Sequence, residues 1–159
     1  MPSVHDFSAK TIDGVDKKLS DYKGHVMLVV NVASKCGLTP QYKALEELHD
    51  AYGKKGLDVV GFPANEFGAQ EPGTEADIKS FCTKNYGVKF DMMSKVVVKG
   101  DGMHPLFAYL TKDSKFAGEI KWNFNKFLIG KDGSVLARFE PKVEPNSPEV
   151  VAAIEKALA

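Results

Sequence analysis

The sequence predicts an α/β fold in which helices flank a central mixed β-sheet. Segments 26–32 and 57–62 are almost entirely apolar, as expected of central strands that are covered on both faces. The chain between them carries apolar residues at helical spacing, and a right-handed β–α–β connection places the two strands parallel and adjacent. Segments 122–129 and 134–139 flank a Gly-Lys-Asp-Gly turn, which indicates an antiparallel hairpin.

The first elements in chain order are a hairpin and a helix. Residues 6–12 and the turn Asp13–Gly14 indicate a small N-terminal β-hairpin. After the strand at 26–32, Thr39 and Pro40 are typical of an N-cap and a first helical residue. The helix that follows is expected to end at a nearby glycine, Gly53 or Gly56. Its predicted buried stripe comprises Tyr42, Leu45, Leu48 and Tyr52.

The middle of the chain combines a second core strand, a loop and a helix. Pro63 is expected to end the strand at 57–62, and residues 64–73 are rich in Gly and Pro, as loops are. Thr74 with Asp77 resembles a capping box that opens the next helix. In that helix Ile78, Phe81 and Cys82 share the apolar face. Residues 85–101 are expected to be a connection.

The elements together predict a thioredoxin-like fold with an N-terminal β-hairpin. A helix is expected from His104 to about Leu110, and a last helix from about Pro148 to Leu158. With 159 residues, we expect one domain spanning 1–159. In open α/β sheets, ligands bind beyond the carboxyl ends of the parallel strands. Cys36 and the loop at 64–73 both follow such ends.

Charge and hydropathy exclude several classes of function. Lys+Arg and Asp+Glu both number 21, and no long block of like charge exists, so we expect no nucleic-acid partner. The N-terminal residues show neither an apolar signal region nor an Arg-rich transit pattern. The longest apolar run, residues 26–30, is too short to span a bilayer, so stable membrane insertion is not expected. These features predict a cytoplasmic protein.

The two cysteines, Cys36 and Cys82, are too few for a disulfide scaffold and fit neither zinc spacing nor a Cys-x-x-Cys pair. The four histidines show no ligand spacing, so we expect no metal and no other cofactor. Cys82 could equally be a buried apolar residue. Cys36 lies between a buried strand and a helix, where unpaired N–H groups and the helix dipole favour a thiolate. Cys36 is therefore a candidate nucleophile.

Three separated blocks, residues 31–39, 62–74 and 121–124, resemble the signature motifs of the glutathione peroxidase family. They read Asn-Val-Ala-Ser-Lys-Cys-Gly-Leu-Thr, Phe-Pro-Ala-Asn-Glu-Phe-Gly-Ala-Gln-Glu-Pro-Gly-Thr and Lys-Trp-Asn-Phe, in the family's order. The resemblance implies a peroxidase whose thiol is oxidised by a hydroperoxide, assisted by a Gln, a Trp and an Asn.

The resemblance assigns these roles to Cys36, Gln70, Trp122 and Asn123. The chemistry is reasonable in its own right. An indole N–H, amide N–H groups and a helix end can stabilise a thiolate without a His or Lys. The same donors can stabilise the departing alkoxide or hydroxide. Without the resemblance, Gln70 would be read as a turn residue, Trp122 as core packing, and Asn123 as a backbone partner at a strand start.

The resemblance also bears on the reductant. Many family members carry a Cys where this chain has Ala64, which leaves Cys82 as the sole candidate for an intramolecular resolving thiol. Residues 81–84 and 88–90 resemble the resolving segment of thioredoxin-dependent members. The stretch 110–121 lacks the oligomerisation insertion of tetrameric, glutathione-using members. The resemblance therefore implies a monomer recycled by thioredoxin or a similar dithiol protein, with hydrogen peroxide and organic or lipid hydroperoxides as substrates.

Three alternatives stay open at this point. The protein could be a peroxide sensor or redox relay, or a glutathione-dependent peroxidase in which Cys82 is structural. A general dithiol oxidoreductase is disfavoured because Cys-x-x-Cys is absent. Cys82 lies in the middle of the predicted helix, whereas a disulfide needs Cα atoms within about 7 Å. If Cys82 resolves, its helix must unwind, and the segment should have low local stability.

Overall fold

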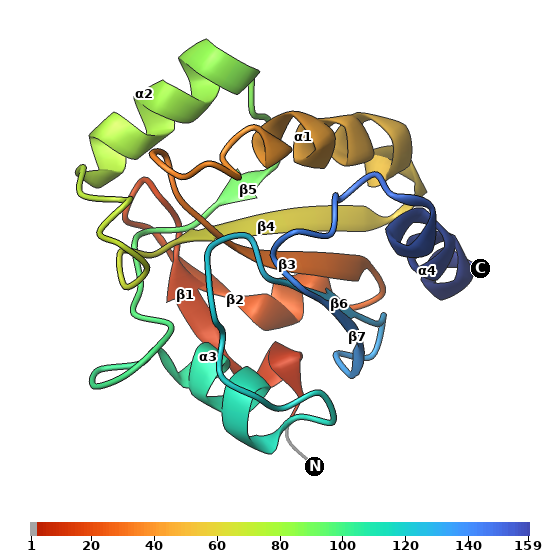
Figure 1. Cartoon of the computed structure of the whole chain (residues 1–159). Coiled ribbons are helices and arrows are strands. Elements are labelled where there is room, and N and C mark those ends of the chain that lie inside the picture. The colour runs from red at the N-terminus through yellow and green to blue at the C-terminus, as the bar shows by residue number, and fades with distance from the viewer. Residues whose placement is uncertain (1–2) are drawn as a thin grey trace.

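The computed structural model describes residues 3–159, and their centre is a five-stranded sheet (Figure 1). The strand order is β5-β4-β3-β6-β7. The strands are β3 (Val26–Val32), β4 (Leu57–Pro63), β5 (Asp91–Met92), β6 (Lys126–Ile129) and β7 (Val135–Phe139). β3, β4 and β5 pair in parallel, whereas β6 and β7 pair antiparallel beside β3. The predicted mixed sheet is thereby confirmed.

The predicted N-terminal hairpin is also confirmed. β1 (Ser8–Lys10) and β2 (Asp16–Lys18) pair antiparallel and form a separate two-stranded sheet. Gly14 adopts a φ of 83° in the turn between them, a conformation that glycine tolerates and most other residues avoid.

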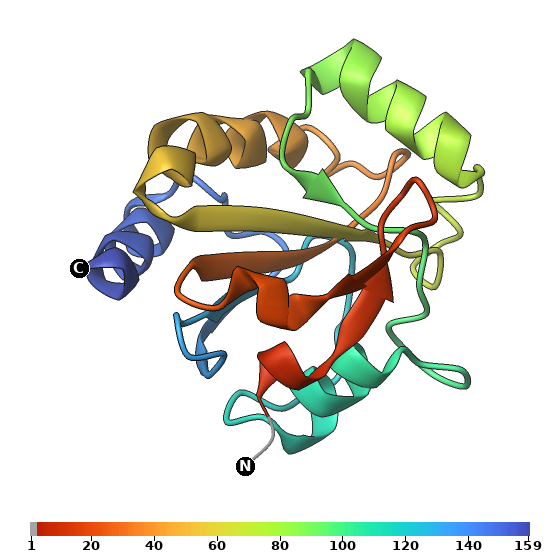
Figure 2. The ribbon, with the colours of Figure 1, turned by 180° about the vertical axis from the view of Figure 1, so that it is seen from behind.

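Helices cover both faces of the five-stranded sheet, as Figures 1 and 2 show from opposite sides. One face packs against α1 (Gln41–Tyr52), α2 (Glu75–Tyr86) and α4 (Pro148–Leu158). The other packs against α3 (Pro105–Ala108), a π-helical turn (Tyr109–Asp113) and two 3₁₀ helices (Val4–Asp6, Leu19–Tyr22). Alternate β3 side chains enter the two resulting cores, so the continuous apolar run reflects burial on both faces.

The helix ends follow the predicted signals in most cases. The Thr74–Asp77 capping box at the start of α2 is present in full. α1 ends at Tyr52 with Gly53 as its C-cap, as predicted, and a 3₁₀ turn (Gly53–Lys55) follows it. Its stripe is buried as predicted except for Tyr52, which is only partly buried.

Three predicted boundaries are wrong. Residues 85–101 are not merely a connection, because α2 continues to Tyr86 and β5 pairs with the edge of β4. A two-residue strand carries no periodic signal, and only its neighbour makes it a strand. Pro63 is the last residue of β4, whereas the prediction ended this strand at residue 62. β6 begins at Lys126 and not at residue 122, because Phe124 has a φ of 67° and leaves the extended conformation.

No helix within residues 3–159 combines the length and the apolar character that crossing a membrane requires.

Candidate active site

Cys36 lies in a series of turns between β3 and α1, at the carboxyl end of β3. Cys36 is 8% exposed, so its thiol is nearly enclosed. The sulfur accepts two hydrogen bonds, from the Leu38 backbone N–H at 3.3 Å and from the Trp122 indole Nε1–H at 3.3 Å. Both donors would stabilise a negative charge on the sulfur. The backbone donor comes from the turn before α1, not from the first turn of the helix as predicted.

Thr39 is not the N-cap of α1, which corrects the prediction. The helix begins at Gln41, Pro40 occupies the cap position, and no side chain caps the helix. The Thr39 hydroxyl instead accepts from the Cys36 backbone N–H at 2.9 Å and donates to the Ala33 carbonyl at 2.8 Å. The Thr39 hydroxyl therefore closes the turn around Cys36, because both of its hydrogen-bond partners are buried backbone groups within that turn.

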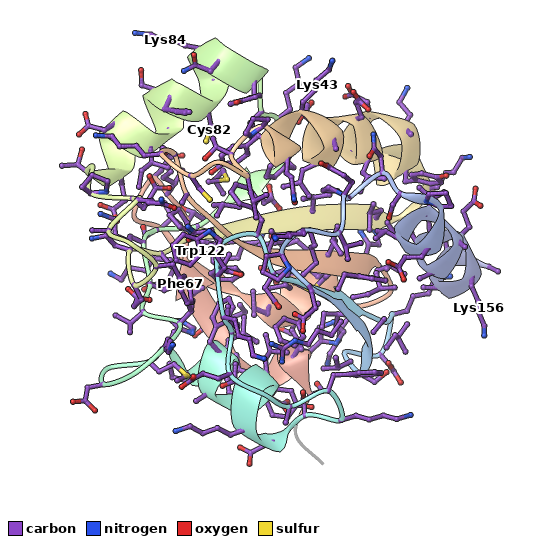
Figure 3. All side chains as sticks on the ribbon, viewed as in Figure 1. Lys43, Phe67, Cys82, Lys84, Trp122 and Lys156 are labelled. Atoms are coloured by element: carbon purple, nitrogen blue, oxygen red, sulfur yellow. The ribbon has the colours of Figure 1, made fainter. Side chains whose placement is uncertain are left out.

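Trp122 lies beside the thiol on the segment that precedes β6. It is 36% exposed, and its ring centroid is 5.9 Å from that of Phe67, next to it in Figure 3. Gly68 passes close beneath the indole: a Cβ there would lie 3.2 Å from the Trp122 ring, and its φ is 71°. The left-handed φ favours glycine at this position, and a Cβ there would also make the indole shift by a few tenths of an ångström. Phe67, which is buried, and Trp122, which is partly exposed, therefore form an aromatic pair on one side of the thiol.

Gln70 and Asn123 form a pair of amides next to the thiol-bearing turn. The Asn123 Nδ2 donates to the Gln70 Oε1 at 3.0 Å, which fixes both side chains. Asn123 is fully buried, and its Oδ1 has no hydrogen-bond partner among residues 3–159. Within the same residues, no hydrogen bond joins either amide to the Cys36 sulfur. The structure thus joins Cys36 to Trp122, and Gln70 to Asn123.

Two hydrogen bonds hold the loop at 64–73 against the Cys36 turn. The Lys35 N–H donates to the Gln70 carbonyl at 3.0 Å, and the Ser34 N–H donates to a Glu71 carboxylate oxygen at 3.2 Å. Glu71 is 1% exposed, and burial raises the pKa of its carboxyl group against the opposing effect of Ser34. Sequence reasoning missed Glu71, because a carboxylate in a Gly/Pro-rich loop looks like a solvated turn residue.

Cys82 is on the apolar side of α2, as predicted, and it is a free thiol like Cys36 (Figure 3). It is 2% exposed, and burial is the main reason that its pKa rises to about 11. The neighbouring Tyr42 hydroxyl lowers this pKa in part, whereas the charge of Glu71 raises it further. In this conformation Cys82 is a protonated, enclosed thiol.

Among residues 3–159, no group of three or more His, Cys, Asp or Glu side chains is placed to hold a metal ion.

Comparisons with known proteins agree with this geometry. The family model for glutathione peroxidase matches residues 4–111. A glutathione peroxidase homologue, BsaA of Halalkalibacterium halodurans, is 52% identical over 90% of this chain and 92% of its own. A hydroperoxy fatty acid reductase of Synechocystis is 45% identical over 98% of this chain and 96% of its own. The thioredoxin/glutathione peroxidase BtuE of Escherichia coli is 44% identical over 94% of both chains.

Solved structures extend the likeness to three dimensions. A crystal structure of Trgpx in its apo form has a TM-score of 0.80 and 38% identity, and the match covers 99% of this chain and 97% of that one. A thiol:disulfide interchange protein of Chlorobium tepidum, at 21% identity and a TM-score of 0.67, shares the thioredoxin-like fold. The chain therefore belongs to the glutathione peroxidase family, and it is a peroxidase with a thioredoxin-like fold.

Proposed function

We propose that the protein is a thiol peroxidase in which Cys36 reduces hydroperoxides. The Cys36 thiolate attacks one peroxide oxygen, a sulfur–oxygen bond forms, and the O–O bond breaks. The sulfur is oxidised to a sulfenic acid, and the departing alkoxide or hydroxide takes a proton to leave as alcohol or water. The observation that carries the proposal is the indole hydrogen bond, 3.3 Å from Trp122 Nε1 to the Cys36 sulfur.

Gln70 and Asn123 are proposed to act on the peroxide. Their mutual hydrogen bond fixes the Gln70 oxygen toward Asn123, which leaves the Gln70 amide N–H₂ available to a bound substrate. Asn123 and Trp122 are neighbours in the chain, so the indole and one amide come from the same segment, while Gln70 comes from the loop at 64–73. Fixed donors of this kind stabilise the charge that develops on the departing oxygen.

Cys82 is proposed to resolve the sulfenic acid. Its thiolate attacks the Cys36 sulfur, a disulfide forms, and the sulfenic oxygen leaves as water with the thiol proton. Cys82 must leave its buried place to do so. Ile78 and Cys82 are the buried residues of α2, and Phe81 and Tyr86 add ring contacts with Tyr42 from partly exposed positions, so a small set of apolar contacts holds the helix in place.

Cavities on both sides of α2 support the same step. One, of about 360 Å³, separates Cys82 and Thr83 from the β1–β2 hairpin. The other, of about 570 Å³, lies between Phe81 on α2 and the turn at Ser34. A helix with a cavity on each side loses few packing contacts when it unwinds, so the free-energy cost of local opening is small.

Thioredoxin or a similar dithiol protein is the proposed reductant of the resulting disulfide. The name of the Escherichia coli relative includes both thioredoxin and glutathione, so it supports a thiol reductant without choosing between them. The presence of a second cysteine favours the dithiol. We propose in addition that the protein acts as a monomer in the cytoplasm, which size-exclusion chromatography and cell fractionation would test.

Lipid hydroperoxides are proposed as substrates besides hydrogen peroxide. The support is the name of the Synechocystis relative, a hydroperoxy fatty acid reductase, together with the apolar rim that Trp122 and Phe67 form beside the thiol. Phe67 is buried, so the part of this rim that could accept an acyl chain is the partly exposed Trp122 ring.

A second candidate is a glutathione-dependent peroxidase in which Cys82 only fills the core. The observation in its favour is the enclosed Cys82 thiol, whose pKa of about 11 keeps it protonated at neutral pH. In this reading, glutathione would attack the Cys36 sulfenic acid directly.

NADPH consumption with a hydroperoxide separates the candidates. The assay compares thioredoxin with thioredoxin reductase against glutathione with glutathione reductase, in the wild type, Cys36→Ser and Cys82→Ser. The proposal predicts turnover with thioredoxin that both substitutions abolish. Turnover with glutathione that survives Cys82→Ser would establish the second candidate. Stoichiometric oxidation without turnover would indicate a sensor or relay instead.

A further inference from the structure

Asn31 is a polar residue inside the most buried strand of the molecule. β3 is buried along its whole length, and Asn31 is 1% exposed. The neighbouring positions on both sides are valines. A buried amide is costly unless its polar atoms find hydrogen-bond partners, so its partners indicate why a polar residue stands in this place.

Within residues 3–159, the hydrogen bonds of Asn31 go to the segment 122–125. The Nδ2 donates to the Trp122 carbonyl at 3.1 Å, and the Oδ1 accepts from the Asn125 N–H at 3.1 Å. In the backbone, the Asn31 carbonyl accepts from the Phe124 N–H at 2.6 Å, and the Asn31 N–H donates to the Asn125 carbonyl at 3.4 Å. One residue thus makes four hydrogen bonds to the segment that carries Trp122 and Asn123.

These bonds explain how the chain leaves the sheet before β6. Regular pairing of β3 with β6 extends to Val30 and Lys126. One position further along, the side-chain oxygen of Asn31 takes the Asn125 N–H, while its backbone carbonyl takes the Phe124 N–H. Phe124 has a φ of 67°, a strained conformation for a residue other than glycine. The hydrogen bonds of the Asn31 side chain therefore offset the strain at Phe124, where the chain turns away and the β3–β6 pairing ends.

The turn directs the preceding two residues at the catalytic groups. Trp122 reaches the Cys36 sulfur, and Asn123 reaches Gln70. Cys36 itself follows Asn31 by five residues along the same stretch of chain. β3 thus positions the thiol through the backbone and its indole donor through Asn31.

We propose that Asn31 is a positioning residue of the peroxidase site, which holds the indole N–H of Trp122 on the Cys36 sulfur. The inference rests on the proposed function insofar as it assigns a role to Trp122. Among residues 3–159, no hydrogen bond joins Asn31 to the Cys36 sulfur, so its effect should pass through the segment 122–125.

The test replaces Asn31 by valine, the residue on both sides of it. Trp122 is the one tryptophan in the chain, so its indole N–H gives a single identifiable proton signal by NMR. In an otherwise wild-type protein, Cys36→Ser should shift this signal, because the sulfur acceptor is lost. In the Asn31→Val background we expect no such response. The rate of hydroperoxide reduction by stopped flow should fall by at least about tenfold.

Two controls keep the result specific. Val60→Ala removes core packing from β4 without touching the segment 122–125, and it should leave both the indole response and the rate unchanged. If Asn31→Val fails to fold, Asn31→Asp keeps the size and the acceptor while losing the Nδ2 donor, and the same two readouts apply.

An indole signal that still responds to Cys36→Ser in the folded Asn31 variant would overturn the proposal, whatever the rate. Failure of the proposed function has a different signature. If Trp122→Phe reacts at the wild-type rate, the catalytic role of Trp122 is wrong, while the NMR response still decides whether Asn31 positions the indole.

Discussion

Cys82 should react with alkylating reagents only when α2 opens, and its reactivity should keep rising to a higher pH than that of an exposed thiol. Burial is the largest cause that raises the pKa of Cys82 from 9.0 to about 11, and Glu71 contributes in the same direction. A thiol with this pKa is protonated in the closed helix throughout the physiological range. Exposure on opening returns the pKa to its ordinary value.

The magnitude follows from the difference between these two values. About two pKa units correspond to about 3 kcal/mol, at about 1.36 kcal/mol per unit. Because the folded-state pKa is the higher one, proton binding stabilises the closed helix in full below pH 9 and ceases to do so as the pH rises to about 11. The open, ionised population should therefore grow about tenfold per pH unit through a range in which an exposed thiol has levelled off.

The assay uses Cys36→Ser, which leaves Cys82 as the single thiol of the chain. Iodoacetamide labelling is followed by intact mass at a series of pH values, and circular dichroism confirms that the protein stays folded at each. The same variant unfolded in urea supplies the exposed reference. A labelling rate that levels off near the reference pH would refute the reasoning, because Cys82 would then titrate as an exposed thiol.

Three substitutions extend these predictions. Gly87→Ala places a side chain at a φ of 57° at the end of α2, at a cost of about 1 kcal/mol, and should speed labelling of Cys82 about fivefold; an unchanged rate would show that opening does not involve this end. Trp122→Phe removes a hydrogen bond to a charged sulfur that contributes about 1.5–3 kcal/mol. The stopped-flow rate of peroxide reduction should fall about 10- to 150-fold, and a loss below about threefold would contradict the assigned role. Thr39→Val leaves the Cys36 N–H without its acceptor and should lower the free energy of unfolding in urea by about 1–3 kcal/mol; equal stability would argue against the turn-closing role.

Local patterns predicted the parts of the fold that depend on neighbours in sequence. β3 and β4 follow from their apolar runs, and α2 follows from its capping box at Thr74 and Asp77. The signal at Thr39 was read wrongly, because a threonine before a proline looks the same whether it caps a helix or closes a turn. Its buried partners, the Cys36 N–H and the Ala33 carbonyl, settle the matter in three dimensions.

Contacts between distant segments supplied what the sequence could not. The late start of β6 depends on hydrogen bonds that the Asn31 side chain donates to Trp122 and accepts from Asn125, more than ninety residues later in the chain. β5 exists only because the edge of β4 is available to it. The contact of Trp122 with Cys36 was expected from a family resemblance, whereas the burial of Glu71 behind the same turn was not expected at all.

The most direct test of the account is the chemical state of the two cysteines after wild-type protein meets a stoichiometric amount of hydroperoxide. Intact mass and peptide mapping would identify the product, with Cys82→Ser and a sulfenic-acid trap as the comparison. We predict a Cys36–Cys82 disulfide in the wild type and a trapped sulfenic acid on Cys36 in the variant. Oxidation of Cys36 beyond the sulfenic acid in the wild type, with Cys82 still a free thiol, would contradict the two-cysteine mechanism.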